Sequence, residues 1–484
     1  MKELAELLKN TPVKVLHGDG STPVAGLVYD SRTVKPGDCF FAVRGTQSDG
    51  HDYIPAALAK GAAAVVCERM PDAPAEGVAW VEVEDSAGAM ADMAAAFCDY
   101  PSRELKLVGI TGTNGKTTTV TLLYDLVRAM GYKAGLISTV VYKIDGREVE
   151  STHTTPDPIR LNAMMREMAD AGCEFCFMEC SSHAIVQERT RGLDFAGGIF
   201  SNITHDHLDY HKTFAEYIRA KKLFFDGLPK GAFALTNADD RNGRVMVQNT
   251  AASVSTYSLR AMADFRCKIV EMHLDGMLLR IDGQELWVGL LGRFNAYNLL
   301  AVYGAAVLLG LDRGEVLRVL SVLHAVSGRF EKIRAANGTT AIVDYAHTPD
   351  ALENVIQTIE EIRTPEQQLI VVCGCGGDRD RTKRPEMAQI AVKYATTAIF
   401  TSDNPRHESP EAILDDMAAG LDSGVRYLRI ADRAEAIRTA VMLSRPGDIL
   451  LVAGKGHETY QIVGDVKHHF DDREEVRKAF QAFN

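Results

Sequence analysis

The sequence predicts an α/β protein of three domains, and three observations lead to this prediction. The chain has 484 residues, which corresponds to about three domains at roughly 150 residues per domain. Hydrophobic residues make up 46% of the chain, enough for each domain to bury a core. Apolar runs typical of buried strands alternate with helical patterns along nearly the whole length, which favours mostly parallel sheets covered by helices.

The first domain is expected over residues 1–100. Its strands lie in the segments GLVYDSR, GDCFFAV and AAAVVCE, and helical patterns cover residues 54–60 and 87–98. The block ends at Tyr100-Pro101-Ser102, where proline favours a break in regular structure.

The second domain is expected over residues 101–329 and opens with a strand in LKLVGI followed by TGTNGKT and a helix. Gly112 and Gly115 allow the backbone to turn tightly and to present its amides to phosphate oxygens, and the start of the helix adds its positive dipole end. Lys116 can reach the β- and γ-phosphates, and the hydroxyl of Thr117 can bind Mg²⁺. The residue five before Gly115 is Ile110 instead of glycine, so the pattern predicts a variant ATP-binding phosphate loop.

Acidic and histidine side chains follow two later strands of this domain. FCFMECSSH places Glu179 and His183 at the end of a strand, and GGIFSNITHDHLDYH continues into His205, Asp206, His207, Asp209 and His211. Carboxylate oxygens with an imidazole nitrogen suit one or two Mg²⁺ ions beside ATP. Zinc is the alternative, although no spacing matches a zinc site cleanly.

The third domain is expected over residues 330–484. TTAIVDYAH, QLIVVCG, TAIFTSD and DILLVAGKG are strand-like, and segments of helical length separate them. This alternation is typical of a doubly wound, Rossmann-like sheet, in which ligands bind at the carboxyl ends of the strands.

Charge and cysteine content narrow the class of protein. A formal net charge of -12 argues against nucleic acid or an anionic membrane as a partner. The first ten residues do not resemble a signal peptide, and the apolar stretch Leu299–Leu311 is shorter than the roughly 20 residues that span a bilayer. Nine irregularly spaced cysteines favour reduced thiols. We therefore expect a cytoplasmic protein without membrane insertion, and a monomer.

Several of these motifs together resemble the Mur ligases, which add amino acids to the peptidoglycan precursor. GTNGKTTT, MECSSHA and NITHDHLDYH are similar to the family's central ATPase domain, and YDSR and GDCFFAVRGTQSDGHDYI to its N-terminal UDP-sugar-binding domain. LGRFNAYN, SGRFE, VDYAHTPDALE, GCGGDRDRTKRP, DNPR and GKGHE resemble its later signatures. The resemblance covers nearly the whole chain. It implies a UDP-sugar-binding α/β domain, a central P-loop ATPase domain with a mostly parallel sheet, and a C-terminal Rossmann-like domain that binds an amino acid.

The resemblance implies amide synthesis in two steps. The γ-carboxylate of D-glutamate in UDP-N-acetylmuramoyl-L-Ala-D-Glu would take the γ-phosphoryl group of ATP, and an amine would attack the acyl phosphate. Lys116 and two Mg²⁺ ions would neutralise the charge. Thr117 and Glu179 would serve one ion, and His207 the other, together with a carbamylated lysine that matches Lys221. Lys222 is adjacent, which leaves the register of this match open.

The resemblance also implies two sets of substrate residues. For ATP they are Gly112, Thr113, Asn114, Gly115, Lys116, Thr117, Thr118, Asn295, Asn298, Arg329 and Asp344. For the UDP-substrate they are Ser31, Thr154, Thr155, Ser181, Gln187 and Arg189.

The amino acid is expected to be meso-diaminopimelate, because DNPR marks its addition in the resembling enzymes. A guanidinium at Arg406 can hold the distal carboxylate, which lysine lacks, in a bidentate manner. The implied pocket consists of Arg379, Asp403, Asn404, Pro405, Arg406, Gly454 and Glu458, with Glu458 pairing with the distal ammonium. The alternatives are a lysine-adding relative, a folylpolyglutamate synthase, and a nucleotide-dependent switch without ligase activity. Closure of the domains around residues 327–331 is a further expectation.

Overall fold

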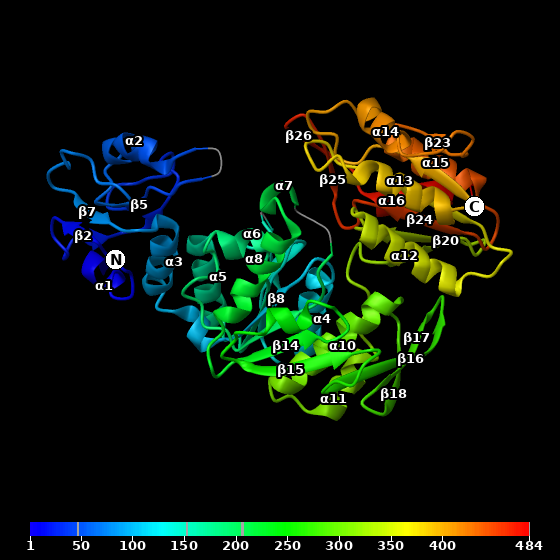
Figure 1. Cartoon of the computed structure of the whole chain (residues 1–484), viewed down its shortest axis with the longest axis horizontal. Helices are drawn as coiled ribbons and strands as arrows, with labels where there is room; N and C mark the ends of the chain where they lie inside the picture. The colour runs from blue at the N-terminus through cyan, green and yellow to red at the C-terminus, as the bar shows by residue number, and fades with distance from the viewer. Residues whose placement is uncertain (46–47, 152, 205–207, 484) are drawn as a thin grey trace.

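The computed structural model describes residues 1–45, 48–151, 153–204 and 208–483. Three α/β units lie side by side, with the N-terminal unit at one end, the central unit below and the C-terminal unit at the other end (Figure 1). Each unit has its own sheet, and the sheets contain five, eleven and six strands. The expected three-unit α/β architecture is therefore present, and the boundaries at residues 100 and 329 stay predictions.

The N-terminal sheet has the strand order β2-β7-β6-β5-β4. Its strands β4 to β7 are parallel, β2 is antiparallel, and buried Phe40, Phe41 and Trp80 belong to its core. The elements of this unit are β1 (Lys2–Glu3), α1 (Leu4–Leu7), β2 (Val15–His17), β3 (Pro23–Val24), β4 (Leu27–Val28), β5 (Cys39–Phe41), η1 (Gly50–Tyr53), α2 (Ile54–Ala59), β6 (Ala64–Cys67), β7 (Ala79–Glu82) and α3 (Ser86–Phe97). The three strands and two helices expected from the sequence are all present.

The central sheet has the order β11-β10-β9-β12-β8-β13-β14-β15-β16-β17-β18. Pairs from β9 to β16 are parallel, whereas the two edges are antiparallel hairpins. The strands are β8 (Lys106–Thr111), β9 (Ala134–Ile137), β10 (Val141–Ile144), β11 (Arg147–Glu150), β12 (Phe175–Glu179), β13 (Gly197–Phe200), β14 (Phe233–Asn237), β15 (Ser253–Ser258), β16 (Phe265–His273), β17 (Gly276–Ile281) and β18 (Gln284–Val288). This arrangement confirms the mostly parallel sheet.

Helices cover both faces of the central sheet. They are η2 (Pro101–Glu104), α4 (Lys116–Ala129), α5 (Pro158–Asp170), α6 (Ser182–Val186), α7 (Leu208–His211), α8 (Phe214–Asp226), α9 (Gly243–Met246), α10 (Arg293–Leu308) and α11 (Arg313–Leu320). α10 is apolar almost all round because α4 and strands β14 to β16 surround it. Its burial explains why Leu299–Leu311 is so hydrophobic.

The C-terminal sheet has the order β19-β20-β24-β21-β22-β23, and every pair except β19 with β20 is parallel. Its elements are β19 (Glu331–Arg334), β20 (Thr340–Asp344), α12 (Pro349–Ile362), β21 (Leu369–Cys373), α13 (Lys383–Tyr394), β22 (Thr397–Phe400), α14 (Pro410–Ala418), β23 (Leu428–Arg429), α15 (Arg433–Leu443), β24 (Ile449–Ala453), β25 (Tyr460–Val463), β26 (Val466–His469) and α16 (Asp472–Phe483). The carboxyl ends of β20, β24, β21 and β22 lie at one edge, where such a sheet binds ligands.

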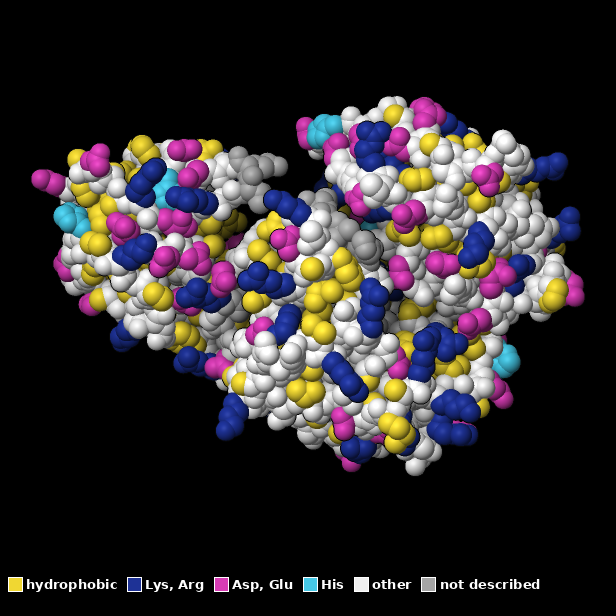
Figure 2. All heavy atoms as spheres, viewed as in Figure 1, with side chains coloured by type: hydrophobic (Ala, Val, Ile, Leu, Met, Phe, Trp, Pro, Cys, Tyr) yellow, Lys and Arg dark blue, Asp and Glu magenta, His cyan; other side chains and the backbone are white. Residues whose placement is uncertain are grey.

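The charged side chains of the surface and the buried cysteines agree with the composition of the chain. Acidic and basic side chains are interspersed on the face shown in Figure 2. Within the described ranges, no helix is long and apolar enough to cross a bilayer. All nine cysteines are free, and eight are buried. Burial raises the pKa of thiols such as that of Cys176, so these buried thiols are held in the protonated, unreactive form.

Candidate active site

The phosphate loop joins β8 to α4 at the middle of the central sheet. Gly112 and Gly115 have φ of 150° and 86°. A Cβ at Gly115 would lie 2.5 Å from Oδ1 of Asn298, and a Cβ at Gly112 would lie 1.9 Å from Oγ of Ser201. Both glycines are therefore required by backbone angle and by space, as the motif predicted.

The residues that follow β13 form hydrogen bonds with the phosphate loop. The amide N of Asn114 donates to Oδ1 of Asn202 at 3.0 Å, and the amide N of Thr113 donates to the carbonyl of Asn202 at 2.8 Å. Oγ of Ser201 donates to the carbonyl of Asn114 at 2.7 Å. Sequence reasoning did not single out Ser201 and Asn202, although their position directly after a strand was a usable signal.

The side chains after the loop converge with the end of β12. Oγ1 of Thr117 donates to Oε1 of Glu179 at 2.8 Å, and the amide N of Thr139 donates to the same oxygen at 2.7 Å. Nζ of Lys116 lies over the loop, 2.9 Å from the carbonyls of Gly112 and Thr113. The structure thus brings together a hydroxyl, a buried carboxylate and an ammonium, as expected from the sequence.

Lys221, on α8, lies directly behind the loop. It is 1% exposed, and its Nζ donates to the carbonyl of Gly112 at 2.7 Å. Nζ of Lys222 instead pairs with Asp226 at 2.5 Å. Of the two adjacent lysines, the one that contacts the phosphate loop is therefore Lys221.

The oxygen ligands of Thr117 and Glu179 fit Mg²⁺, since hydroxyl and carboxylate oxygens are the donors that this ion prefers. His205, Asp206 and His207 lie outside the described residues. Among the residues that the structure describes, no group of three His, Cys, Asp or Glu side chains could hold a metal ion. The described Nε2 of His211 lies 2.9 Å from Oγ of Ser182.

The segment that joins the central and C-terminal units, together with α12, completes the nucleotide site. Nη2 of Arg329 donates to Oγ1 of Thr117 at 3.2 Å, and its guanidinium lies 4.5 Å above the ring of Tyr345. Nε of Arg329 is buried without a hydrogen-bond partner among the described residues, which leaves a donor for a ligand. Oδ2 of Asp350 accepts from Nδ2 of Asn114 at 2.9 Å, so that α12 contacts the loop itself.

Asp344, at the end of β20, is a buried carboxylate behind Arg329. Its Oδ2 accepts from the amide N of Phe330 at 2.7 Å. Burial raises the pKa of Asp344 to about 6, against the opposing effects of Arg329 and two backbone amides. The carboxylate thereby ties the strand end to the segment that joins the two units.

A cavity of about 470 Å³ lies between the loop and the C-terminal unit. Its volume is within the range of nucleotide and cofactor sites. Asn298 lines it, whereas Asn295 is buried behind Asn298 and donates to the carbonyl of Leu291 at 2.7 Å. The expected ATP residues on its wall are Thr113, Asn114, Gly115, Lys116, Thr117, Thr118, Asn298, Arg329 and Asp344.

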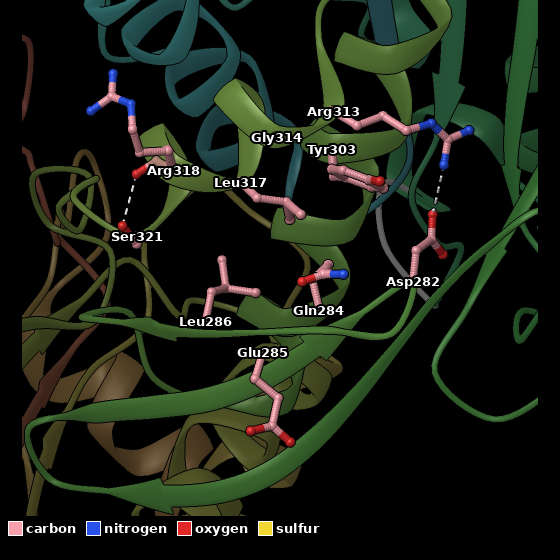
Figure 3. Close-up of a pocket in the computed structure, with 10 residues that line it drawn as sticks. All are labelled: Asp282, Gln284, Glu285, Leu286, Tyr303, Arg313, Gly314, Leu317, Arg318 and Ser321. Atoms are coloured by element: carbon pink, nitrogen blue, oxygen red, sulfur yellow. Dashed lines mark hydrogen bonds and ion pairs between the residues drawn. The ribbon is translucent and has the colours of Figure 1, made fainter.

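A larger cavity of about 670 Å³ lies elsewhere on the central unit, between the β17–β18 hairpin and α11 (Figure 3). Arg313 and Asp282 form an ion pair at its edge, with Nη1 and Oδ2 3.3 Å apart. None of the site residues expected from the sequence lines it. The smaller cavity, with the phosphate loop and a buried carboxylate, is therefore the candidate active site.

Five of the six expected UDP-substrate residues form one cluster beside Glu179. Oγ1 of Thr155 donates to the carbonyl of Glu179 at 2.7 Å and accepts from the amide N of Ser181 at 3.2 Å. Nη1 of Arg189 donates to the carbonyl of Thr155 at 2.7 Å, and its Nη2 donates to Oε1 of Gln187 at 2.6 Å. Oγ1 of Thr139 donates to Oγ1 of Thr154 at 3.0 Å.

The sixth residue, Ser31, belongs to the N-terminal unit and is half-buried. Tyr29, two residues before Ser31, lies near Asp157 and Arg189 of the central unit, beside the cluster of expected UDP-substrate residues. Burial raises the pKa of the Tyr29 phenol, and the charges of Asp157 and Arg189 act on it in opposite directions. The N-terminal unit therefore borders the cluster.

The DNPR segment follows β22 and meets the GKGHE loop that follows β24. Nδ2 of Asn404 donates to Oε2 of Glu458 at 2.9 Å. Arg406 has a φ of 52°, and its Nη1 donates to the carbonyl of Gly377 at 2.8 Å. A Cβ at Gly454 would lie 2.5 Å from Oδ2 of Asp403, so this position needs glycine.

The remaining expected residues of this pocket lie around it. The carbonyl of Pro405 lies against Gly377, where a Cβ would approach to 1.8 Å, and Arg379 is exposed. Burial raises the pKa of Glu458, and the negative charge of Asp403 adds to this effect. The segment contains cationic and anionic groups side by side, which suits a zwitterionic ligand.

Taken together, the phosphate loop and the two strand-end clusters define an enzyme that gathers a nucleotide and further ligands between α/β domains. Family models match the chain as the Mur ligase family catalytic domain over residues 23–98, the Mur ligase middle domain over 110–306 and the Mur ligase glutamate ligase domain over 328–456. The chain belongs to the Mur ligase family and is an ATP-dependent, amide-bond-forming ligase.

Full-length relatives support this assignment. The chain is 54% identical to "UDP-N-acetylmuramoyl-L-alanyl-D-glutamate--2,6-diaminopimelate ligase" of Bacteroides thetaiotaomicron, over 99% of each chain. It is 55% identical to the protein of the same name from Parabacteroides distasonis, also over 99% of each chain. A solved structure of a ligase of that name is 34% identical, covers 100% of this chain and 99% of its own, and superposes with a TM-score of 0.71. A MurF ligase from Thermotoga maritima, 20% identical over 95% of this chain and 97% of its own, shares the fold with a TM-score of 0.64.

Proposed function

We propose that this enzyme joins meso-2,6-diaminopimelate to the γ-carboxylate of D-glutamate in UDP-N-acetylmuramoyl-L-Ala-D-Glu, with ATP activating the carboxylate as an acyl phosphate. The product is an intermediate of peptidoglycan synthesis. The observation that carries the proposal is the segment after β22, in which Arg406 lies two residues beyond Asn404, the partner of Glu458, in a chain 54% identical to a named diaminopimelate ligase.

ATP binds in the cavity at the phosphate loop in this proposal. The backbone of the loop holds the phosphates, and Lys116 moves from the loop carbonyls to the β- and γ-phosphates. Arg329, already beside Thr117, offers its guanidinium to the charge that develops on the transferred phosphoryl group. Asp344 supports the position of Arg329 through the neighbouring amide of Phe330.

Two Mg²⁺ ions accompany ATP. Thr117 and Glu179 would hold one, and His207 and a carbamylated Lys221 would hold the other. When bound, such ions would supply positive charge that neutralises the phosphates. The donor chemistry of Thr117 and Glu179 and the burial of Lys221 against the loop support this assignment.

The UDP-substrate spans the N-terminal and central units. Ser31 contacts its nucleotide end, and Thr154, Thr155, Ser181, Gln187 and Arg189 hold its diphosphate, amide and carboxylate groups. These five residues adjoin Glu179 through Thr155 and Thr139, which supports a path for the D-glutamate carboxylate toward the γ-phosphate of ATP.

The amino acid occupies the pocket at Asp403 to Arg406 and Gly454 to Glu458. Arg406 and Arg379 bind the distal carboxylate, and Glu458 binds the distal ammonium. Lysine would leave the guanidinium of Arg406 without its partner, which disfavours it by several kcal/mol. The near amine then attacks the acyl phosphate, and closure of the domains around residues 327–331 excludes water.

A direct experiment measures phosphate release with MgATP and UDP-N-acetylmuramoyl-L-Ala-D-Glu, comparing meso-diaminopimelate with L-lysine. We expect release with diaminopimelate at a rate at least about 100-fold above that with lysine, because a bidentate charge pair is lost with lysine. Arg406→Ala should reduce this preference, whereas Arg438→Ala, which removes an exposed arginine on α15, should keep it. Equal rates with the two amino acids would refute the specificity, and release without any amino acid would favour a nucleotide switch.

We also propose that the enzyme works as a cytoplasmic monomer without a nucleic-acid partner. Nine free cysteines, the net charge of -12 and the interspersed surface charges support this proposal. Light scattering at several protein concentrations would test the monomer.

A further inference from the structure

The GKGHE loop contains a lysine that the proposed reaction does not use. Lys455 is 0% exposed, which is unusual for lysine because a buried ammonium must be paired. Its Nζ donates to Oε2 of Glu458 at 2.8 Å and to Oδ1 of Asn404 at 3.0 Å. Both partners belong to the pocket proposed for the amino acid, so Lys455 connects the two loops that form it.

These contacts determine how Asn404 is turned. Its Oδ1 faces two donors, Nζ of Lys455 and the amide N of Ile462 at 2.9 Å. Its Nδ2 therefore points to Oε2 of Glu458 at 2.9 Å. Since an amide offers an acceptor on one side and donors on the other, the buried ammonium selects the orientation in which Asn404 supports the carboxylate.

Glu458 is held through one oxygen and leaves the other available. Oε2 accepts from both Lys455 and Asn404, whereas Oε1 accepts no hydrogen bond from any residue in the described ranges. The side chain of Glu458 is 13% exposed, so this oxygen is not fully enclosed. A carboxylate with one anchored and one open oxygen is well suited to bind an ammonium group of a ligand.

The charge balance of the pocket also depends on Lys455. Burial raises the pKa of Glu458, and the carboxylate of Asp403 is near enough for its charge to raise this pKa further. Lys455 and the amide of Asn404 oppose this rise. Among the described residues, the phenols of Tyr345 and Tyr460 also lie near Glu458, whose charge raises the pKa of both in addition to burial. Lys455 is thus a cation hydrogen-bonded to Glu458, and its charge opposes the effect of burial on this carboxyl group.

We propose that Lys455 is a positioning residue for the amino-acid substrate: its buried ammonium orients Asn404 and anchors Oε2 of Glu458, so that Oε1 of Glu458 can receive an ammonium group of the incoming diamino acid. This inference rests on the proposed function, which places that amino acid in this pocket. Lys455 acts through Asn404 and Glu458, and it does not contact ATP or the UDP-substrate. Its loss should therefore affect one of the three substrates selectively.

The first test is Lys455→Met, which keeps the length of the side chain and removes the charge. We expect KM for meso-diaminopimelate to rise roughly 10- to 100-fold, as for the loss of a charge-assisted hydrogen bond. The KM values for ATP and the UDP-substrate and the affinity for ADP should change less than about twofold, within the usual error of additivity. Lys478→Met is a matched control because Lys478 forms an exposed pair with Glu475 at the same three-residue spacing, and it should leave every KM unchanged.

The second test measures how the KM for diaminopimelate depends on pH, because a residue with a merely structural role would not shift this dependence. Without Lys455, the pKa of Glu458 rises, so protonation of Glu458 begins at a higher pH as the solution is acidified. The increase in KM for diaminopimelate at low pH should therefore start at a higher pH in Lys455→Met than in the wild type. In a Glu458→Gln background, Lys455→Met should raise KM by less than about threefold and should cause no shift, because the two residues act as one unit.

Three outcomes with Lys455→Met would overturn the inference. The first is an unchanged KM for diaminopimelate, and the second is an equal increase in this KM in the wild-type and Glu458→Gln backgrounds. The third is an increase in this KM that is the same at every pH. If Lys455→Met fails to bind ADP, Lys455→Gln, which keeps an N–H donor without the charge on a slightly shorter side chain, should show the same pH shift. Failure of both variants to bind ADP would make Lys455 a folding residue and would also overturn the inference. A wild-type enzyme that releases no phosphate with diaminopimelate would instead refute the proposed function.

Discussion

The buried carboxylate of Asp344 allows a prediction in which stability and activity move in opposite directions. Burial raises the pKa of Asp344 from 3.8 to about 6. A raised carboxyl pKa means that the fold prefers the protonated form, so the ionised form costs free energy of folding above that pH. At about 1.4 kcal/mol per pKa unit, the difference of roughly two units amounts to about 3 kcal/mol at pH 8. Asp344→Asn should remove this cost.

The expected gain depends on pH in a defined way. The cost is absent below pH 3.8, grows as pH rises toward 6 and is complete above it. At pH 5 it is therefore about half of its value at pH 8. Oδ1 of an asparagine can still accept from the amide of Phe330, but its NH₂ group needs an acceptor, so we expect a net gain of about 1–3 kcal/mol at pH 8.

Thermal unfolding of the unliganded protein at pH 5 and pH 8 measures this effect. We expect the Tm of Asp344→Asn to exceed that of the wild type by roughly 3–9 °C at pH 8, and the difference should be smaller at pH 5 because the cost that is removed there is only about half as large. Ligase activity should fall, because Asp344 supports the segment that carries Arg329. Asp471→Asn is a control of opposite sign, since its hydrogen bonds with Arg473 help to hold the pKa of Asp471 below its usual range against the effect of burial. A Tm difference for Asp344→Asn that is negative, or equal at both pH values, would refute the reasoning.

Three further predictions concern the loop, the metal and the core. Gly115→Ala should weaken ADP binding by more than about 10-fold, because the new Cβ would lie 2.5 Å from Asn298. Gly131 has a similar φ and open space around it, so Gly131→Ala should leave the affinity for ADP unchanged. Equal effects of the two substitutions would count against the steric argument. Glu179→Gln should raise the Mg²⁺ concentration for half-maximal activity by about 10-fold or more, and an unchanged Mg²⁺ titration would show that Glu179 is not a ligand. Arg433→Met should destabilise the C-terminal unit by about 3–5 kcal/mol, since Asp472 would lose its partner at 0% exposure, and a wild-type Tm would contradict this.

Motifs whose function depends on neighbouring residues in the chain were the most predictable part of the site. The phosphate loop needs glycines, a lysine and a hydroxyl in one short segment between a strand and a helix, and β8, the loop and α4 have this arrangement. Similarly, strand ends are recognisable because apolar runs stop abruptly at polar residues, as at Glu179 and Asp344. The family resemblance extended these local patterns to the substrates.

Contacts between distant segments were not predictable from the pattern of residues. Lys221 and Lys222 are indistinguishable in a helical sequence, and only the packing of α8 against Gly112 separates the buried lysine from the one paired with Asp226. Ser201 and Asn202 were missed as supports of the loop, because their role depends on the pairing of β13 with β8. The role of Lys455 is not visible in the GKGHE motif, because its partner Asn404 lies 51 residues away in the chain.

The sequence by itself determined the class of the protein: three α/β units and a phosphate loop between a strand and a helix. These properties depend on periodicity and on the chemistry of short segments. The tertiary structure alone decided which groups act together, including Thr117 with Glu179 and Arg329, and Asn404 with Lys455 and Glu458. The physical reason is that charge and hydrogen bonding act over a few ångströms, whereas the residues involved are far apart in the chain and meet only when the sheets order their strand ends.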